Sequence, residues 1–107
     1  LALASDIKIM RLGGHFAGGS ILHWARDGGI VLSGDIVQVT PGADAVSFMW
    51  SYPNMLPLPA SAVADITRRL GAVTFNRLYG AFEGKDILQN ADEIVRRSGE
   101  KYIACLR

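Results

Sequence analysis

The hydrophobic positions in the first half of the chain recur at the spacing of β-strands. Residues 6–12 alternate polar and apolar side chains, which is typical of a strand. Residues 20–25 and 29–33 predict a second and a third strand. The Asp27-Gly28 pair between them is typical of a tight hairpin turn. Because residues 29–33 are apolar through their middle, we expect the third strand to be buried on both faces. Shorter strands are expected at residues 36–39 and 45–50.

The second half of the chain has the spacing of helices. Ser61 is a suitable N-cap, and Val63, Ile66 and Leu70 follow at helical intervals before a stop at Gly71. Residues 72–79 return to the composition of a strand. The longest helix is expected from about Asp86 to Leu106, with an apolar stripe formed by Leu88, Ala91, Val95, Ser98, Tyr102 and Leu106. This order predicts an α/β (α+β) fold, a mixed or antiparallel sheet with two helices on one face.

The length of the chain limits it to one domain or less. The sequence has 107 residues and 50% hydrophobic composition, which excludes a disordered tail. We interpret residues 1–107 as a single, partial domain, with hairpins in residues 1–56 and a helix–strand–helix unit in residues 57–107. So small a chain buries a limited fraction of its surface, and we therefore expect a homo-oligomer or another cover for its apolar excess.

The charge balance excludes two classes of partner. The formal net charge is +1 and no single-sign block exceeds two residues, so we expect neither nucleic-acid nor membrane-surface binding. The apolar stretches are too short to span a bilayer. One thiol, Cys105, and no visible export signal favour a cytoplasmic setting. Because Cys105 has no nearby histidine, we interpret it as a buried or incidental thiol.

Two glycine-flanked residues carry the strongest chemical signal. Gly14-His15 lies in a glycine-dense loop after the first strand, and Ser33-Gly34-Asp35 ends the third strand. Imidazole nitrogen and carboxylate oxygen are metal ligands, and glycine leaves room for a metal and a substrate beside the backbone. A hairpin returns the chain to the same edge of the sheet, so we expect His15 and Asp35 to become neighbours.

In order and spacing these motifs resemble the metallo-β-lactamase-fold hydrolase superfamily. The resemblance implies that His15 is a ligand to one metal and that Asp35 bridges or binds the metals. It covers most of the chain and implies the C-terminal half of an αββα sandwich. The complete protein would then use zinc, or iron or manganese, to activate water against an ester, thioester, lactone or phosphodiester of a small molecule.

The chain departs from the family pattern at two points. The motif His-x-His-x-Asp-His is absent, and the loop after residues 72–79 reads Gly80-Ala81-Phe82 where the family usually has a histidine. Because a catalytic zinc normally has three protein ligands, we expect this chain alone to hold no metal and to be inactive. The alternative is a protein of this fold that has lost its metal site and acts as a binding or structural module. A third interpretation is an independent small α/β domain that only mimics the motifs.

Two other features have structural or functional interpretations. The aromatic segment around residues 48–55 includes Phe48, Trp50 and Tyr52, which we predict to flank a substrate pocket or else to form an interface or core plug. His23 lies in a strand, where a packing role is expected.

Overall fold

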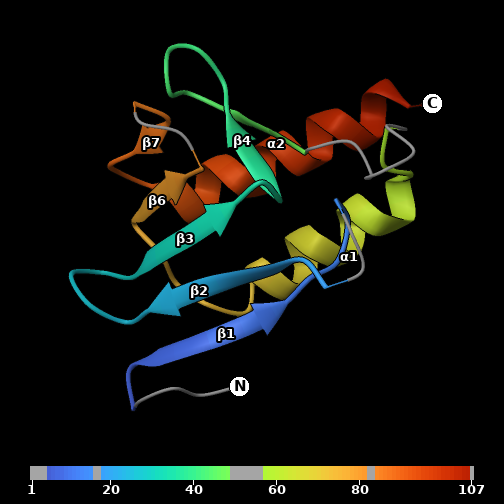
Figure 1. Cartoon of the computed structure of the whole chain (residues 1–107). Coiled ribbons are helices and arrows are strands. Elements are labelled where there is room, and N and C mark those ends of the chain that lie inside the picture. Colours follow the sequence, from blue (N-terminus) through green and yellow to red (C-terminus); the bar gives the residue numbers. More distant parts are fainter. Residues whose placement is uncertain (1–4, 16–17, 49–56, 82–83, 107) are drawn as a thin grey trace.

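A five-stranded sheet, a two-stranded sheet and two helices make up the computed structural model (Figure 1). The structure describes residues 5–15, 18–48, 57–81 and 84–106. In chain order the elements are β1 (Ile7–Arg11), β2 (Ser20–Trp24), β3 (Ile30–Gly34), β4 (Val37–Val39), β5 (Val46–Phe48), α1 (Ala60–Leu70), β6 (Arg77–Gly80), β7 (Asp86–Ile87) and α2 (Ala91–Cys105).

The larger sheet has the strand order β1-β2-β3-β6-β7 and is mixed. Its only parallel pair among the described residues is β3 with β6, in which Val31 pairs with Leu78. This pairing begins at a close approach between Gly29 and the backbone before β6. A Cβ at Gly29 would lie 1.9 Å from the carbonyl oxygen of Thr74, and φ is +96° there, so only glycine fits. The backbone N–H of Asn76 donates to the Gly29 carbonyl at 2.9 Å and aligns the two strands.

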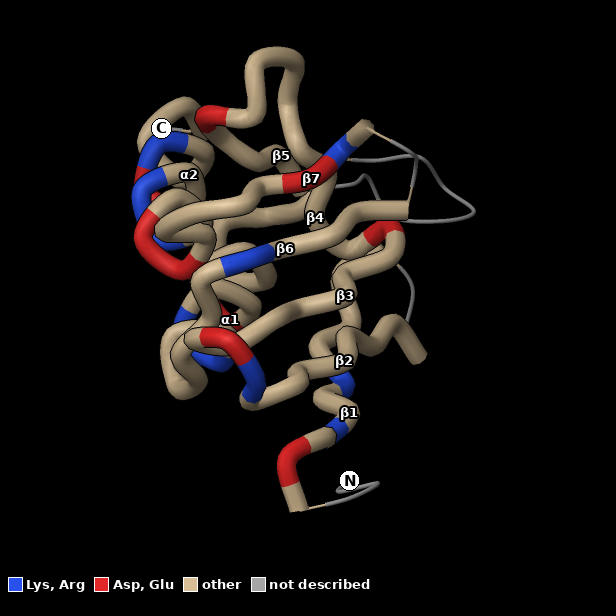
Figure 2. Tube along the Cα trace, turned by 90° about the vertical axis from the view of Figure 1, so that its left-hand side faces the viewer, with Lys and Arg blue, Asp and Glu red and all other residues tan. Residues whose placement is uncertain are grey.

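Both helices pack on the same face of this sheet (Figure 2). The sheet residues on this inner face are Ile21, His23, Val31, Ser33, Leu78 and Ile87, all buried. They meet the buried stripe of α1, which consists of Val63, Ile66 and Leu70, and the buried residues Ala91 and Val95 of α2. The predicted fold class, a mixed sheet with two helices on one face, is therefore confirmed. His23 has the packing role expected of it, because it is buried on the inner face, where its Nε2 lies 2.9 Å from the carbonyl oxygen of Thr74.

The opposite face of the sheet is less covered than the sequence pattern predicts. Residues 29–33 are predicted to be buried on both faces, but Leu32 in the middle of β3 is 45% exposed. The prediction is wrong at Leu32, because α1 and α2 both lie on the inner side, whereas Ile30 on the same outer side is buried at 8% exposure.

The second helix starts later than its apolar stripe predicts. Residues Asp86–Ile87 form strand β7 against β6, and Leu88 is 60% exposed. Asn90 has a left-handed backbone with φ of 55°, and its N–H donates to Oδ1 of Asn76 at 2.8 Å. This long-range contact ends the strand and allows α2 to begin at Ala91.

Three other predicted boundaries also shift by a few residues. Residue Pro59, not Ser61, occupies the N-cap position of α1, while Gly71 ends that helix as predicted. Strand β6 covers only Arg77–Gly80, which is the end of the predicted residues 72–79 and one residue beyond them. Of the predicted strand at residues 45–50, Val46–Phe48 is confirmed, and residues 49–50 lie outside the described residues. Neither described helix is long and apolar enough to cross a membrane.

The hairpin formed by β4 and β5 is tied to α2. The buried N–H of Val46 donates to Oγ of Ser98 at 2.9 Å. The ring of Phe48 meets that of Tyr102 edge to face, with centroids 5.5 Å apart. The hydroxyl of Tyr102 in turn donates to the carbonyl of Leu58 at 3.0 Å, which connects α2 to the start of the α1 region.

Replacing Ser98 tests how much this buried contact contributes. Ser98→Ala leaves the Val46 N–H without its partner, so we expect the free energy of unfolding to fall by about 1–3 kcal/mol. Urea denaturation followed by circular dichroism measures this change. Ser47→Ala is the control, because Ser47 lies on the same strand and is exposed. Equal effects of the two substitutions would contradict a stabilising role for the Ser98 bond.

Candidate functional site

Three connections meet at one end of the larger sheet. They are the β1–β2 loop, the residues that follow β3, and the turn between β6 and β7. Since β2 and β3 are antiparallel with Leu22 opposite Leu32, β2 begins where β3 ends. Because β3 and β6 are parallel with Gly34 opposite Gly80, these two strands end at the same level. The β1–β2 loop, which carries His15, and the end of β3, which Asp35 follows, therefore lie at the same end of the sheet (Figure 1). That the two side chains are neighbours stays a prediction.

The β1–β2 loop is closed at its base and packed at Gly14. The N–H groups of Leu12 and Gly13 both donate to the carbonyl of Gly19, at 2.9 and 3.0 Å. Gly14 has φ of +84°, and a Cβ there would lie 2.9 Å from Cδ1 of Ile66 on α1. This close approach fixes the backbone directly before His15, which is half-buried.

Asp35 follows a sharp bend at the end of β3. Gly34 has φ of +56°, and Asp35 after it is exposed. The bend is anchored from inside by Ser33, which is fully buried and has its hydroxyl 3.3 Å from the carbonyl oxygen of Val37. The chain thus turns the carboxylate toward solvent while holding the preceding residue in the core.

Asp35 shares a shallow hollow with a residue that the sequence pattern does not single out. Lys85, in the turn between β6 and β7, lines this hollow together with Asp35, Gly80 and Ala81. Only the parallel pairing of β3 with β6 places Lys85 there. Nothing in the local sequence around Lys85 indicates that pairing.

The donor atoms at this sheet end do not form a complete metal site. Within the residues that the structure describes, no group of three or more His, Cys, Asp or Glu side chains could hold a metal ion. The described part of the β6–β7 turn contributes Gly80, Ala81 and Lys85 but no histidine. Two donors, His15 and Asp35, fall short of the three protein ligands of a catalytic zinc. A catalytic metal therefore does not fit the described residues alone.

Of the three aromatic residues predicted to flank a substrate pocket, the structure describes Phe48. Phe48 is 1% exposed and packs in the core against Tyr102. Trp50 and Tyr52 lie outside the described residues. A substrate-pocket role for these three residues stays a prediction. Cys105 is exposed at the end of α2, which agrees with an incidental thiol and contradicts a buried one.

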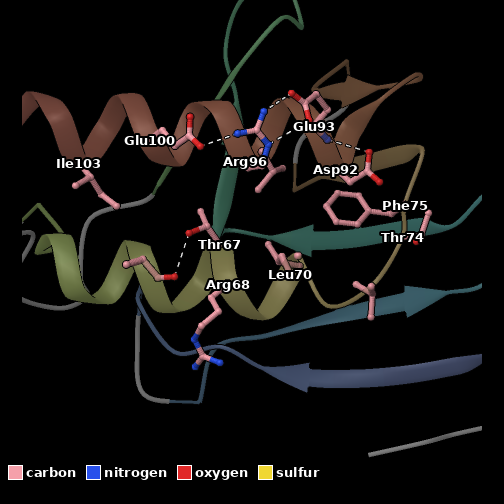
Figure 3. A pocket seen from close by; sticks show the side chains of 14 residues that line it. Thr67, Arg68, Leu70, Thr74, Phe75, Asp92, Glu93, Arg96, Glu100 and Ile103 are labelled. Atoms are coloured by element: carbon pink, nitrogen blue, oxygen red, sulfur yellow. Dashed lines mark hydrogen bonds and ion pairs between the residues drawn. The ribbon is translucent and has the colours of Figure 1, made fainter.

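A second hollow lies elsewhere, between α1 and α2 (Figure 3). It has a volume of about 540 Å³. Its apolar lining includes Leu70, Phe75, Val95 and Ile103. Neither His15 nor Asp35 lines it, so it is separate from the sheet end described above.

The charged side chains around this hollow pair within their own helices. Arg96 forms ion pairs with Glu93 and, at 2.6 Å, with Glu100. The hydrogen bond from Arg96 lowers the pKa of the Glu93 carboxyl, and the same pair raises the pKa of Arg96. Arg68 pairs with Asp65 at 2.7 Å. These contacts are typical of solvated helix faces and assign no ligand to the hollow.

Comparison with known proteins supports the fold more strongly than the activity. No family model matches the sequence. The uncharacterized protein YmaE of Bacillus subtilis strain 168 is 47% identical over 109 residues, which cover 99% of this chain and 39% of YmaE. The chain thus spans about two fifths of the length of that relative.

Two solved structures resemble the chain over nearly its whole length. A metallo-beta-lactamase family protein of Thermus thermophilus matches with a TM-score of 0.53 and 21% identity, over 99% of this chain and 32% of its own. A B3 metallo-beta-lactamase with an active-site glutamic acid matches with a TM-score of 0.52 and 21% identity, over 100% of this chain and 44% of its own. The chain has part of the metallo-β-lactamase fold. At this identity the likeness describes the fold alone.

Replacing Gly14 tests whether the loop before His15 depends on its contact with α1. Gly14→Ala adds a strained left-handed backbone and a clash with Ile66, so we expect a loss of about 2–3 kcal/mol in the free energy of unfolding. Gly13→Ala is the control, because φ is also positive but the Cβ position is open, and we expect a loss of about 1 kcal/mol. Thermal denaturation compares the two variants. Equal losses would mean that Gly14 does not rest on α1.

Proposed function

We propose that this chain is part of a metal-dependent hydrolase of the metallo-β-lactamase type. In this proposal His15 and Asp35 are two of the metal ligands, and the other ligands lie outside these 107 residues. The observation that carries the proposal is the register of β2 with β3, which brings the His15 loop and Asp35 to one end of the sheet. The resemblance of the fold to metallo-beta-lactamase proteins supports it.

The proposal is limited to a class of reaction. The substrate would be a small molecule with an ester, thioester, lactone or phosphodiester bond, and the metal would be zinc, iron or manganese, in a cytoplasmic protein. The two donors of this chain do not complete a site, so the 107-residue chain by itself is expected neither to retain metal nor to hydrolyse these bonds.

A second candidate function is a protein that keeps the fold without the metal chemistry. The observation that favours it is the β6–β7 turn, whose described residues include no histidine, and no histidine follows His23 in the sequence. Such a protein would be a binding or structural module. The two candidates differ in one measurable property, which is bound metal in the complete gene product.

Metal content and hydrolysis of the complete gene product distinguish the two candidates. We expect about one or two metal ions per chain by elemental analysis, with activity on at least one of the four bond types. His15→Ala and Asp35→Asn should each lower metal content and reduce activity by about 100-fold or more, because each removes a metal ligand. Absence of metal and of hydrolysis in the unaltered protein would favour the module.

The control for this experiment is an aspartate away from the sheet end. Asp44→Asn alters an exposed carboxylate next to β5, at the tip of the β4–β5 hairpin, and should leave metal content and activity unchanged. A protein that loses metal with Asp44→Asn as readily as with Asp35→Asn would contradict the assignment of Asp35 as a ligand.

A further inference from the structure

The hollow between α1 and α2 lies on the helix side of the larger sheet (Figure 2). The chain has part of the metallo-β-lactamase fold, an αββα sandwich in which two sheets pack face to face between outer layers of helices. The helix-free side of this sheet, which we call the outer face, is therefore the side that meets the other sheet. The hollow faces away from that contact, and neither His15 nor Asp35 lines it.

Two close contacts set the spacing of the segments around the hollow. Helix α2 approaches α1 at Gly99, where a Cβ would lie 2.3 Å from Cγ2 of Thr67. The loop after α1 is joined to the first turn of α2, because the N–H of Asp92 donates to the carbonyl of Phe75 at 3.0 Å. The hollow is thus bounded by segments that already contact one another, as is usual for small-molecule sites.

The hollow has the size and the lining of a small-molecule site. Its volume of about 540 Å³ falls within the range of roughly 300–1,000 Å³ that is typical of ligand pockets. Its lining is mostly apolar and includes Val73, which is half-buried and so offers part of its surface to a ligand. This lining favours a ligand with an apolar body, because contact removes apolar surface from water.

One charged side chain at the hollow has no charged partner within the described residues. The arginines that line the hollow pair with carboxylates of their own helices. None of the ion pairs of the described chain includes Asp92, which is half-buried in the first turn of α2. Its Oδ1 accepts the N–H of Glu93 at 2.9 Å, so one of its two oxygens is used within the helix. An ammonium group in the hollow would supply the missing counter-charge.

We propose that the hollow between α1 and α2 binds an organic cation, a molecule with an apolar body and an ammonium group. The apolar body lies against Val73 and Val95, and the ammonium group pairs with the carboxylate of Asp92. Val95 follows Asp92 by three residues on α2 and therefore lies on the same helix face. This site is independent of the metal chemistry proposed for the sheet end.

Three probes with the same apolar body and different head groups test the proposal. They are phenylbutylamine, phenylbutanol and phenylbutyrate, and their binding to the complete gene product is measured by calorimetric or NMR titration. We expect the amine to bind about 5-fold more tightly than the alcohol, because only the amine pairs with Asp92. The carboxylate should bind more weakly than the alcohol, because it places a like charge beside Asp92.

Three variants assign the binding to these side chains. Asp92→Asn keeps the shape of the side chain without its charge, so it should weaken the amine by about 5-fold and leave the alcohol unchanged. Asp44→Asn is the control, because Asp44 is an exposed carboxylate that does not line the hollow. Val73→Ala removes apolar surface and should weaken the amine and the alcohol alike, by about 3-fold. Circular dichroism checks that each variant keeps its helix content.

Three results would overturn the proposal. They are the absence of saturable amine binding, an amine that binds no more tightly than the alcohol, and amine binding that Asp92→Asn leaves unchanged. The metal content and the hydrolytic activity of the same protein do not enter this test, so this proposal and the proposed metal chemistry can fail separately.

Discussion

The parallel pairing of β3 with β6 is the contact on which the arrangement of the whole chain depends. Before this pair the chain forms consecutive hairpins, and after it the chain alternates strand and helix. The pairing requires the chain to travel over one face of the sheet through α1, and it joins both halves into one sheet. It depends on the absence of a side chain at Gly29, where the Thr74 carbonyl oxygen occupies the position of a Cβ. Two features follow from this pairing: both helices pack on one face of the sheet, and three connections meet at one end of it.

The sequence pattern predicts the elements that are stabilised by their own neighbours in the chain. The hairpin strands β1, β2 and β3 lie within one or two residues of their predicted bounds, and so does α1. The pattern fails where a distant residue decides the outcome. Residues 86–88 fit a helical stripe, but pairing with β6 and the hydrogen bond from Asn90 to Asn76 make the first two of them a strand.

Burial on the two faces of β3 shows the same limit. Residues 29–33 are apolar on both sides, and the pattern alone cannot say whether a layer covers each side. Val31 and Leu32 are adjacent and equally hydrophobic in type, yet one is fully buried and the other is 45% exposed. The difference comes from the connection through α1, which places both helices on the side of Val31.

The candidate site also has one part that local sequence predicts and one part that distant residues decide. The placement of the His15 loop and Asp35 at one end of the sheet follows from hairpin geometry, which the sequence indicates through its Asp27-Gly28 turn. The place of Lys85 beside Asp35 follows from the parallel pair, which no local signal reveals. The hollow between α1 and α2 also arises from packing between segments distant in sequence, and no motif points to it.

The exposed apolar surface of the sheet and the incomplete set of metal donors are separate features of the chain. Each would have to be completed by a different kind of contact. The outer face opens perpendicular to the sheet, and any apolar surface of matching shape and charge can cover it. The sheet end opens along the strands, and completing a metal site there needs particular side chains at particular positions. His15 and Asp35 are two donors, and a catalytic zinc normally has three protein ligands. Covering the outer face would therefore not complete a metal site, because the missing donors would have to lie at the sheet end.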